Sequence, residues 1–141
     1  LNSLGAKQIT LEDLLKKADI VSIHLPLNES TKNLINRKKL NLLKPNAIII
    51  NASRGGIINE RDLAQALIKR TLRGVVMDVF EDEPIKENNP LINLPEDIQD
   101  NIILTPHIAG VTKQSWNYLF KESWQNVENF LSGKPVKYLV N

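Results

Sequence analysis

The sequence predicts an α/β fold in which helices flank a parallel sheet. Short runs that are apolar throughout, such as residues 47–50 and 102–104, alternate with segments whose apolar residues recur at helical spacing. Strands without a polar face are typical of parallel sheets that helices cover on both faces. The 141 residues are enough for one domain with a hydrophobic core.

The first half of the chain contains signals for two short helices and two strands. Thr10 can cap a helix in which Asp13 is the third residue and Leu11, Leu14 and Leu15 form the apolar face. The elements that we expect next are a strand over residues 19–25 that Pro26 ends, a helix over 36–43, and a strand over 47–51.

The second half continues the alternation. Asn59 is expected to cap a helix that runs to about Arg70, with Leu63, Ala66 and Leu67 facing the core. After it we expect a strand over residues 74–79, a loop over 81–100 that is rich in proline, asparagine and acids, and a strand over 102–105.

The strongest helical pattern lies at the end of the chain, over residues 111–133. Gly133 and Pro135 are expected to end this helix. We interpret its apolar and aromatic stripe as a face that packs into the core rather than as a ligand site. The residues of the stripe are Trp116, Leu119, Phe120, Ser123, Val127, Phe130 and Leu131.

Composition argues against several classes of protein. The net charge of +2 and the lack of a long basic run give no indication of a nucleic-acid partner. There is no cysteine for disulfides or thiolate metal sites, and the two histidines, His24 and His107, are too few and too far apart for a typical zinc site. No apolar run approaches the roughly 20 residues of a membrane span. We therefore expect a cytoplasmic protein without a metal. Because the chain begins with Leu1 rather than methionine, we also expect it to be a piece of a longer one.

Charged and titratable side chains follow the ends of the predicted strands. His24 lies at the end of the first strand, Arg54 follows the second, Asp78 and Glu83 follow the third, and His107 follows the last. In a parallel sheet these carboxyl ends share one rim, where ligands bind. An arginine, two carboxylates and one or two histidines on one rim suit proton transfer beside an anionic substrate.

Two of these residues have the clearest chemical potential. The guanidinium of Arg54 matches a carboxylate in two parallel hydrogen bonds, and the glycines after it let a ligand approach; the alternative is a structural salt bridge at a strand end. His107 can give or take a proton near neutral pH, although a lone histidine is more often structural.

The two acids have weaker individual signals. Glu83 is one of several acids in its segment, and a carboxylate bonded to a histidine would fix the orientation of its ring. Asp78 ends an apolar strand, so it needs hydrogen-bond donors: an amide on a ligand or, alternatively, local groups that it caps.

Four motifs together resemble the D-isomer-specific 2-hydroxyacid dehydrogenases, the family that includes 3-phosphoglycerate dehydrogenase and hydroxypyruvate or glyoxylate reductases. They are "DIVSIHLPLNEST" (19–31), "NASRGGIINERDLAQAL" (51–67), "GVVMDVFEDEP" (74–84) and "NIILTPHIAG" (101–110). They occur in the family's order, and the resemblance extends over essentially the whole chain.

The resemblance implies an enzyme that interconverts a D-2-hydroxy acid and a 2-keto acid with NAD, NADP not being excluded. Arg54 would bind the substrate carboxylate and keto oxygen, and His107 would be the general acid and base. Glu83, rather than Glu81, would pair with His107, and Asp78 would hold the nicotinamide carboxamide. The cofactor-binding set that the resemblance implies is Leu25, Ala52, Ser53, Arg54, Asp78, His107 and Gly110. The full-length protein would be a homodimer.

The chain departs from the family at its beginning. The family's first strand, its glycine-rich turn and its substrate domain are not found, so we expect a partial Rossmann-type sheet without the first β-α-β unit. Residues 1–110 would be the C-terminal part of the dinucleotide-binding domain, 111–133 the long helix, and 134–141 a tail that returns to the absent substrate domain. Ala6–Ile9 would be a strand at the far edge of the sheet.

The strand over 19–25 would then lack its usual neighbour and expose an apolar edge. We expect the isolated chain to be inactive, and either to associate through this edge or to be completed by further chain. Two other functions remain open: a non-catalytic relative that senses NAD and acts through protein partners, and an inactive structural fragment.

Overall fold

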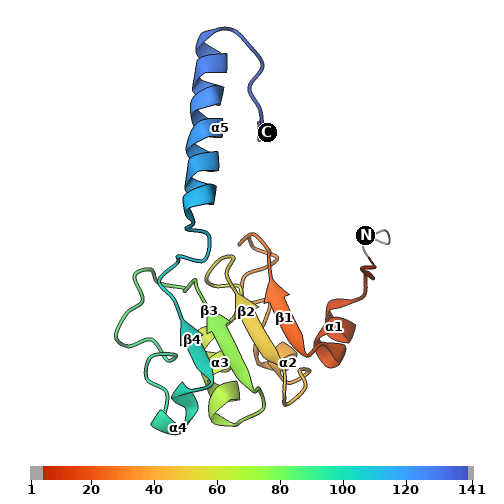
Figure 1. Ribbon diagram of the computed structural model, residues 1–141. Helices are drawn as coiled ribbons and strands as arrows, with labels where there is room; N and C mark the ends of the chain where they lie inside the picture. Colours follow the sequence, from red (N-terminus) through yellow and green to blue (C-terminus); the bar gives the residue numbers. More distant parts are fainter. Residues whose placement is uncertain (1–4, 140–141) are drawn as a thin grey trace. The chain divides into compact units, whose positions relative to one another are not determined.

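The computed structural model describes residues 5–139 and contains a four-stranded parallel sheet in the order β1-β2-β3-β4 (Figure 1). The strands are β1 (Ile20–Ile23), β2 (Ile48–Asn51), β3 (Gly74–Met77) and β4 (Ile102–Leu104). The predicted α/β class with a parallel sheet is confirmed. The chain divides into two compact units, Leu1–His107 and Ile108–Asn141, which we describe separately.

The strands are shorter than predicted, but they pair in sequence order and in one continuous register. Ile23 pairs with Asn51, Asn51 with Met77, and Met77 with Leu104, so these four residues form one row across the sheet. Sequential parallel neighbours require the chain to cross over between strands, and the helical segments do this.

Side-chain caps fix the starts of three helices: α1 (Leu11–Lys17), α2 (Arg37–Leu40) and α3 (Glu60–Ile68). Thr10 Oγ1 accepts a hydrogen bond from the backbone N–H of Asp13 at 3.1 Å, as predicted. Asn36 and Asn59 cap α2 and α3 in the same way. The predicted loop over 81–100 contains one further helix, α4 (Glu96–Gln99), which its four residues and its uncapped start concealed in the sequence.

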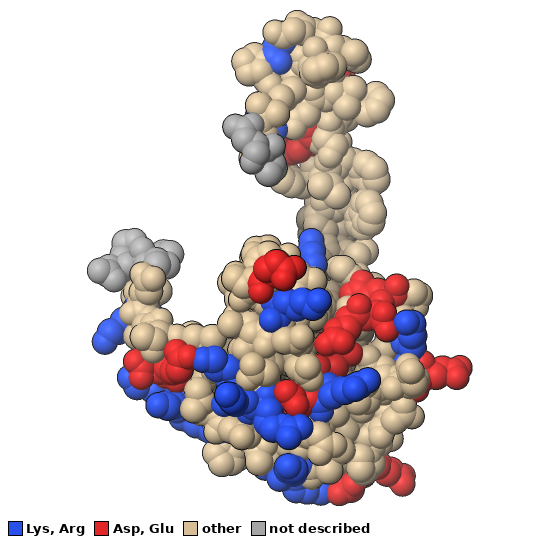
Figure 2. All heavy atoms as spheres, turned by 180° about the vertical axis from the view of Figure 1, so that it is seen from behind, with Lys and Arg blue, Asp and Glu red and all other residues tan. Residues whose placement is uncertain are grey.

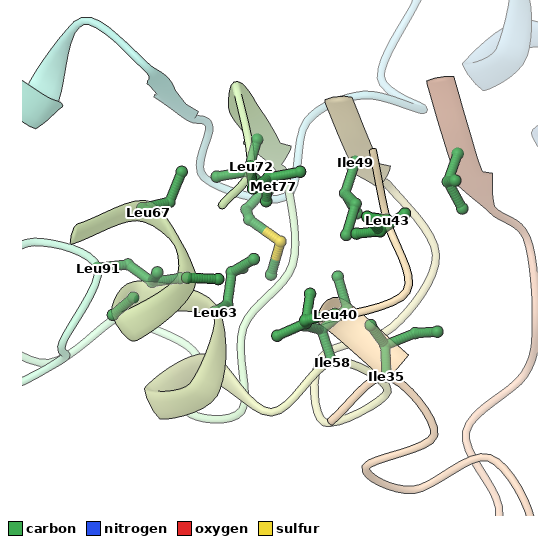
Figure 3. Packing of buried hydrophobic residues seen from close by; sticks show 14 of the residues in the cluster. Ile35, Leu40, Leu43, Ile49, Ile58, Leu63, Leu67, Leu72, Met77 and Leu91 are labelled. Atoms are coloured by element: carbon green, nitrogen blue, oxygen red, sulfur yellow. The ribbon is translucent and has the colours of Figure 1, made fainter. Parts of the chain in front are cut away.

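The hydrophobic core lies between one face of the sheet and the helices. Alternate residues of β1 and β2 are buried, and all of β3 except Val76 is buried. In Figure 3, Leu63 of α3 lies beside Met77 of β3, and both are fully buried. Leu63, Ala66 and Leu67 all face the core, as predicted.

The opposite face of the sheet is not buried to the same extent. Ile20 is 61% exposed and Ile103 is 58% exposed, and Ile48, Ile50 and Val76 are half-buried. The expectation that helices cover both faces is therefore wrong for the described residues. The apolar character of both faces is real, but the helices of the Leu1–His107 unit bury only one of them.

Residues 6–9 do not form the predicted edge strand. They have no regular secondary structure and are exposed. A strand needs a neighbour for its backbone hydrogen bonds, and β1 pairs only with β2 among the described strands. That the chain either associates through the edge of β1 or is completed by further chain stays a prediction.

The Ile108–Asn141 unit consists mainly of the long helix α5 (Lys113–Leu131), which begins with a capping box between Thr112 and Ser115. No residue of α5 is buried, so within the described residues the predicted packing of its stripe into a core is not found. Trp116 and Phe120 of the stripe stack on each other instead, with ring centroids 5.2 Å apart. The chain after the helix runs back along it, where Asn126 exchanges two hydrogen bonds with the backbone of Lys137. The assignment of residues 134–141 to a tail that returns to a substrate domain stays a prediction.

The surface carries charges of both signs. In Figure 2, lysine and arginine side chains lie among aspartate and glutamate side chains. Salt bridges connect several of these groups, including Lys39 with Glu12 and Arg37 with Asp62. Over residues 5–139, no helix has the length and apolar character that crossing a membrane requires.

The packing of α3 can be tested with two neighbouring residues. Leu67 is 1% exposed and Ile68 is 41% exposed. Leu67→Ala should lower the free energy of unfolding by about 2–5 kcal/mol because it leaves a cavity. Ile68→Ala should lower it by at most about 1 kcal/mol. Urea denaturation followed by circular dichroism measures both, and equal losses would contradict the assignment of the buried face.

Candidate active site

The parallel register brings four chain segments to one rim. The four strands end in the row that is formed by Ile23, Asn51, Met77 and Leu104. The next residue along each strand's chain is His24, Ala52, Asp78 and Thr105, respectively. The backbone ladder continues one step further on two strands: the N–H of Asp78 donates to Asn51 O at 2.9 Å, and that of Thr105 donates to Met77 O at 2.9 Å. The carboxyl ends therefore lie level with one another.

A buried asparagine shapes the turn that carries Arg54. The side-chain oxygen of Asn51 accepts hydrogen bonds from the N–H of Ser53 at 3.1 Å and from its hydroxyl at 2.9 Å, and its amide donates to Arg54 O at 2.9 Å. Asn51 is only 1% exposed, so this network is fixed in the core while Arg54 stays exposed. The strand thus ends in a turn that places one guanidinium on the rim.

The guanidinium of Arg54 forms no salt bridge with the part of the chain that the structure describes. Its Nη1 donates to Ser53 O at 2.6 Å, and no ion pair within residues 5–139 includes Arg54. The alternative of a salt bridge at the strand end is therefore not observed. The geometry leaves the group suited to an anionic ligand.

Glu83 and His107 form a direct pair although they are far apart in the sequence. His107 Nδ1 lies 2.7 Å from Glu83 Oε2, and the backbone N–H of Phe80 donates to Glu83 Oε1 at 3.0 Å. The hydrogen bond with His107 and then that with Phe80 lower the pKa of Glu83 below its ordinary value. The carboxylate is therefore ionised near neutral pH, so Nδ1 carries a proton and donates, which leaves Nε2 of His107 for a ligand.

His107 also has an unusual backbone conformation. Its φ is 55°, in the left-handed region, and its N–H donates to Thr105 O at 3.0 Å. Histidine is among the residues that tolerate this region better than most. Conformations of this kind are concentrated at functional sites, where the surrounding structure holds them.

Asp78 is 3% exposed and lies at the point where β3 reaches the rim. The hydroxyl of Thr105 donates to its Oδ1 at 2.5 Å. The sequence left two readings open, a ligand amide or local groups. The structure provides a local donor, and a contact of Asp78 with a ligand stays a prediction.

The remaining residues of the predicted site differ in their exposure and in the part of the chain that carries them. Leu25 is 41% exposed and, like Ala52, follows the end of a strand, whereas Ser53 is half-buried in the turn. Gly110 belongs to the Ile108–Asn141 unit, so its prediction stays untested. His24 pairs with Ser22, whose hydroxyl lies 2.8 Å from Nε2.

A cavity of about 380 Å³ adjoins the Glu83–His107 pair. Besides Glu83 and His107, the residues that line this cavity are apolar: Phe80, Pro84, Ile85 and Pro106. Neither this lining nor the role of Asn51 in shaping the turn was predicted from the sequence. A polar residue at the end of an otherwise apolar strand was the available signal for Asn51.

Comparison with known proteins gives one family. Residues 1–109 match the model of the D-isomer specific 2-hydroxyacid dehydrogenase, NAD binding domain. A glyoxylate reductase of Aeropyrum pernix is 38% identical over 138 residues, which are 98% of this chain and 40% of that protein. The chain thus spans about two fifths of this relative's length.

Solved structures agree with this result. An acyclic imino acid reductase in complex with NADPH and D-Arg has a TM-score of 0.84 and 33% identity over 96% of this chain and 42% of that one. A D-lactate dehydrogenase with NAD+ from Lactobacillus jensenii has a TM-score of 0.81 and 29% identity over 94% of this chain and 42% of that one.

The Glu83–His107 hydrogen bond can be tested by titration. His107→Gly removes the imidazole and accepts the positive φ, so it should raise the pKa of Glu83 toward its ordinary value of 4.5. Carbon-13 NMR of the Glu83 carboxyl group measures this. Because the folded-state pKa is lowered, the pair stabilises the fold above the ordinary pKa of glutamate, and this contribution disappears as the pH falls through the lowered value.

His24→Gly is the matched control, because His24 pairs with Ser22 rather than with Glu83. An unchanged pKa of Glu83 in His107→Gly would contradict the pairing, as would an equal rise in both variants.

Proposed function

Because residues 1–109 belong to the NAD-binding domain family of the D-isomer specific 2-hydroxyacid dehydrogenases, we propose that this chain is part of an NAD(P)-dependent oxidoreductase. The enzyme interconverts a D-2-hydroxy acid and the corresponding 2-keto acid. The observation that carries the proposal is the Glu83–His107 hydrogen bond, on a rim that also carries an arginine without a salt-bridge partner among the described residues.

Arg54 binds and orients the substrate. Its planar fork of N–H donors pairs with the substrate carboxylate, and the positive charge also polarises the oxygen on C2. The fixed turn around Asn51 holds the backbone of Arg54 in place before substrate arrives. Less conformational freedom is therefore lost on binding.

His107 transfers the proton, and Glu83 keeps the ring in place. In the direction of oxidation, the 2-hydroxyl proton moves to Nε2 of His107 while the C2–O bond becomes a carbonyl. In the direction of reduction, the same nitrogen returns the proton to the oxygen. Since Glu83 accepts from Nδ1, it fixes the tautomer and stabilises the imidazolium that forms.

The residues on the rim fit a nicotinamide cofactor. The carboxylate of Asp78 is an acceptor suited to a carboxamide N–H, and Leu25 and Ala52 offer exposed apolar surface for a flat ring. Ser53 and His107 complete the set that would line it within the Leu1–His107 unit, and the role of Gly110 stays a prediction. A nicotinamide held by these residues would supply the hydride acceptor for oxidation at C2 and the hydride donor for reduction. We favour NAD and leave NADP open, because the similar structures hold one or the other.

The substrate class is a small 2-hydroxy or 2-keto acid. The names of the similar proteins refer to glyoxylate, lactate and an imino acid, so the class is supported but not one member of it. The length of the glyoxylate reductase supports a longer enzyme of which this chain is a part. We further propose a cytoplasmic location and a homodimer for that enzyme.

The catalytic assignment predicts two different kinetic effects in the full-length enzyme that contains these residues. His107→Asn tolerates the positive φ but removes the proton carrier, so kcat should fall about 100- to 10,000-fold. Arg54→Lys keeps the charge but loses the planar fork, so kcat/KM should fall about 10- to 100-fold. Steady-state assays with glyoxylate or pyruvate, each with NADH and NADPH, measure both.

Arg37→Lys is the control for charge and size, because Arg37 pairs with Asp62 on the surface and should leave kcat/KM unchanged. The isolated 141 residues should show no turnover. Full activity of His107→Asn would contradict the role of His107, and turnover by the isolated chain would contradict its assignment as a part of a longer enzyme.

A further inference from the structure

A buried carboxylate that the proposed chemistry does not use lies close to the active-site loop. Glu60, the first residue of α3, is only 4% exposed. Burial, together with the nearby charges of Glu81 and Asp82, raises its pKa above the ordinary value. Burying a carboxylate here costs free energy, which its hydrogen bonds must offset.

Both oxygens of Glu60 bind the same loop. Oε1 accepts a hydrogen bond from the backbone N–H of Glu81 at 2.7 Å, and Oε2 accepts one from the Asn89 side-chain amide at 2.6 Å. Asn89 is itself 8% exposed, and its side-chain oxygen accepts from the N–H of Leu91 at 2.9 Å. One side chain therefore anchors this loop at two points eight positions apart.

The first anchor point adjoins the residues that hold the catalytic pair. Glu81 follows Phe80, whose N–H donates to Glu83 Oε1, and Glu83 Oε2 bonds to His107. A shift of the backbone at Glu81 would therefore move the N–H that orients the Glu83 carboxylate.

The turn that carries Arg54 packs against the same point. A Cβ atom added to Gly55 would lie 1.8 Å from Phe80 O and 2.1 Å from Phe80 C, so the two backbones are in direct contact. Only glycine allows this approach. Phe80 and Glu81 are thus fixed from two sides, by the Gly55 backbone and by the Glu60 carboxylate.

We propose that Glu60 is a positioning residue for the reaction: by holding the backbone of Glu81 beside Gly55, it sets the position of the Glu83–His107 pair relative to Arg54. The inference rests on the proposed function. Glu60 belongs to the segment that follows Arg54, whereas Glu81 belongs to the segment that leads to Glu83. The carboxylate therefore connects the part of the site that binds substrate with the part that transfers the proton.

Glu60→Gln is the test, because it keeps the shape of the side chain but replaces one acceptor with a donor that faces another donor. In the 141-residue chain, the pKa of Glu83 should rise toward the value that it has in the His107→Gly variant. The reason is that the loop shifts and the hydrogen bonds of the Glu83 carboxylate lengthen. In the full-length enzyme, kcat should fall about 10- to 100-fold with a smaller change in KM. Glu87→Gln is the matched control, an exposed acid of the same loop with the same change of charge, and it should change neither quantity.

The outcomes separate this inference from the proposed function. A Glu60→Gln variant that loses stability but keeps the Glu83 pKa and kcat of the unmodified protein would overturn the inference and leave Glu60 a purely structural residue. If Glu60→Gln does not fold, Asn89→Ala removes one of the two anchors and should shift both quantities in the same direction by less, and no shift would overturn the inference. If the full-length enzyme has no dehydrogenase activity, the proposed function fails, while the NMR titration still decides whether Glu60 positions Glu83.

Discussion

The structure depends above all on the parallel register that aligns Ile23, Asn51, Met77 and Leu104 in one row. Because the strands end level with one another, the segments that follow them reach the rim together. A slip in the register of β4 would displace His107 from Glu83, although it would change no residue of the site. The chemistry on the rim is thus a consequence of backbone pairing in the core.

Three buried polar side chains turn this alignment into a defined site. Asn51 folds the turn before Arg54, Asp78 accepts from Thr105 at the end of β3, and Glu60 holds the loop that leads to Glu83. Removing each of these polar side chains from water costs free energy, and only well-placed hydrogen bonds offset that cost. No buried side-chain nitrogen or oxygen of the described residues lacks a partner. The polar groups of the core therefore serve to position loops.

Those parts of the fold that local residue patterns encode could be predicted from the sequence. Asn59 is a strong local signal, and the cap and the inward face of α3 were predicted correctly. The parallel sheet also followed from the alternation of apolar runs and helical segments. By contrast, α4 is a single turn without a side-chain cap, and nothing in its periodicity distinguishes it from a loop. The position of Glu60 against Glu81 depends on a contact between residues 21 positions apart, which no local pattern encodes.

The wrong predictions share one physical cause. An apolar pattern shows that a surface is suited to burial, but it does not show that the same chain provides the cover. The second sheet face and the stripe of α5 are apolar, as the sequence indicated, yet the described residues leave Ile103 and Phe120 more than half exposed. Residues 6–9 have the same difficulty as a strand, because the described chain gives them no neighbour.

In the proposed enzyme, Arg54, Glu83 and His107 act together on one substrate. The most direct measurement is a crystal structure of the full-length enzyme with cofactor and oxamate, an unreactive analogue of a 2-keto acid. We expect the oxamate carboxylate to pair with the Arg54 guanidinium while its C2 oxygen lies about 2.6–3.2 Å from Nε2 of His107. Oxamate bound elsewhere, or an imidazole of His107 turned away from both Glu83 and the ligand, would contradict it.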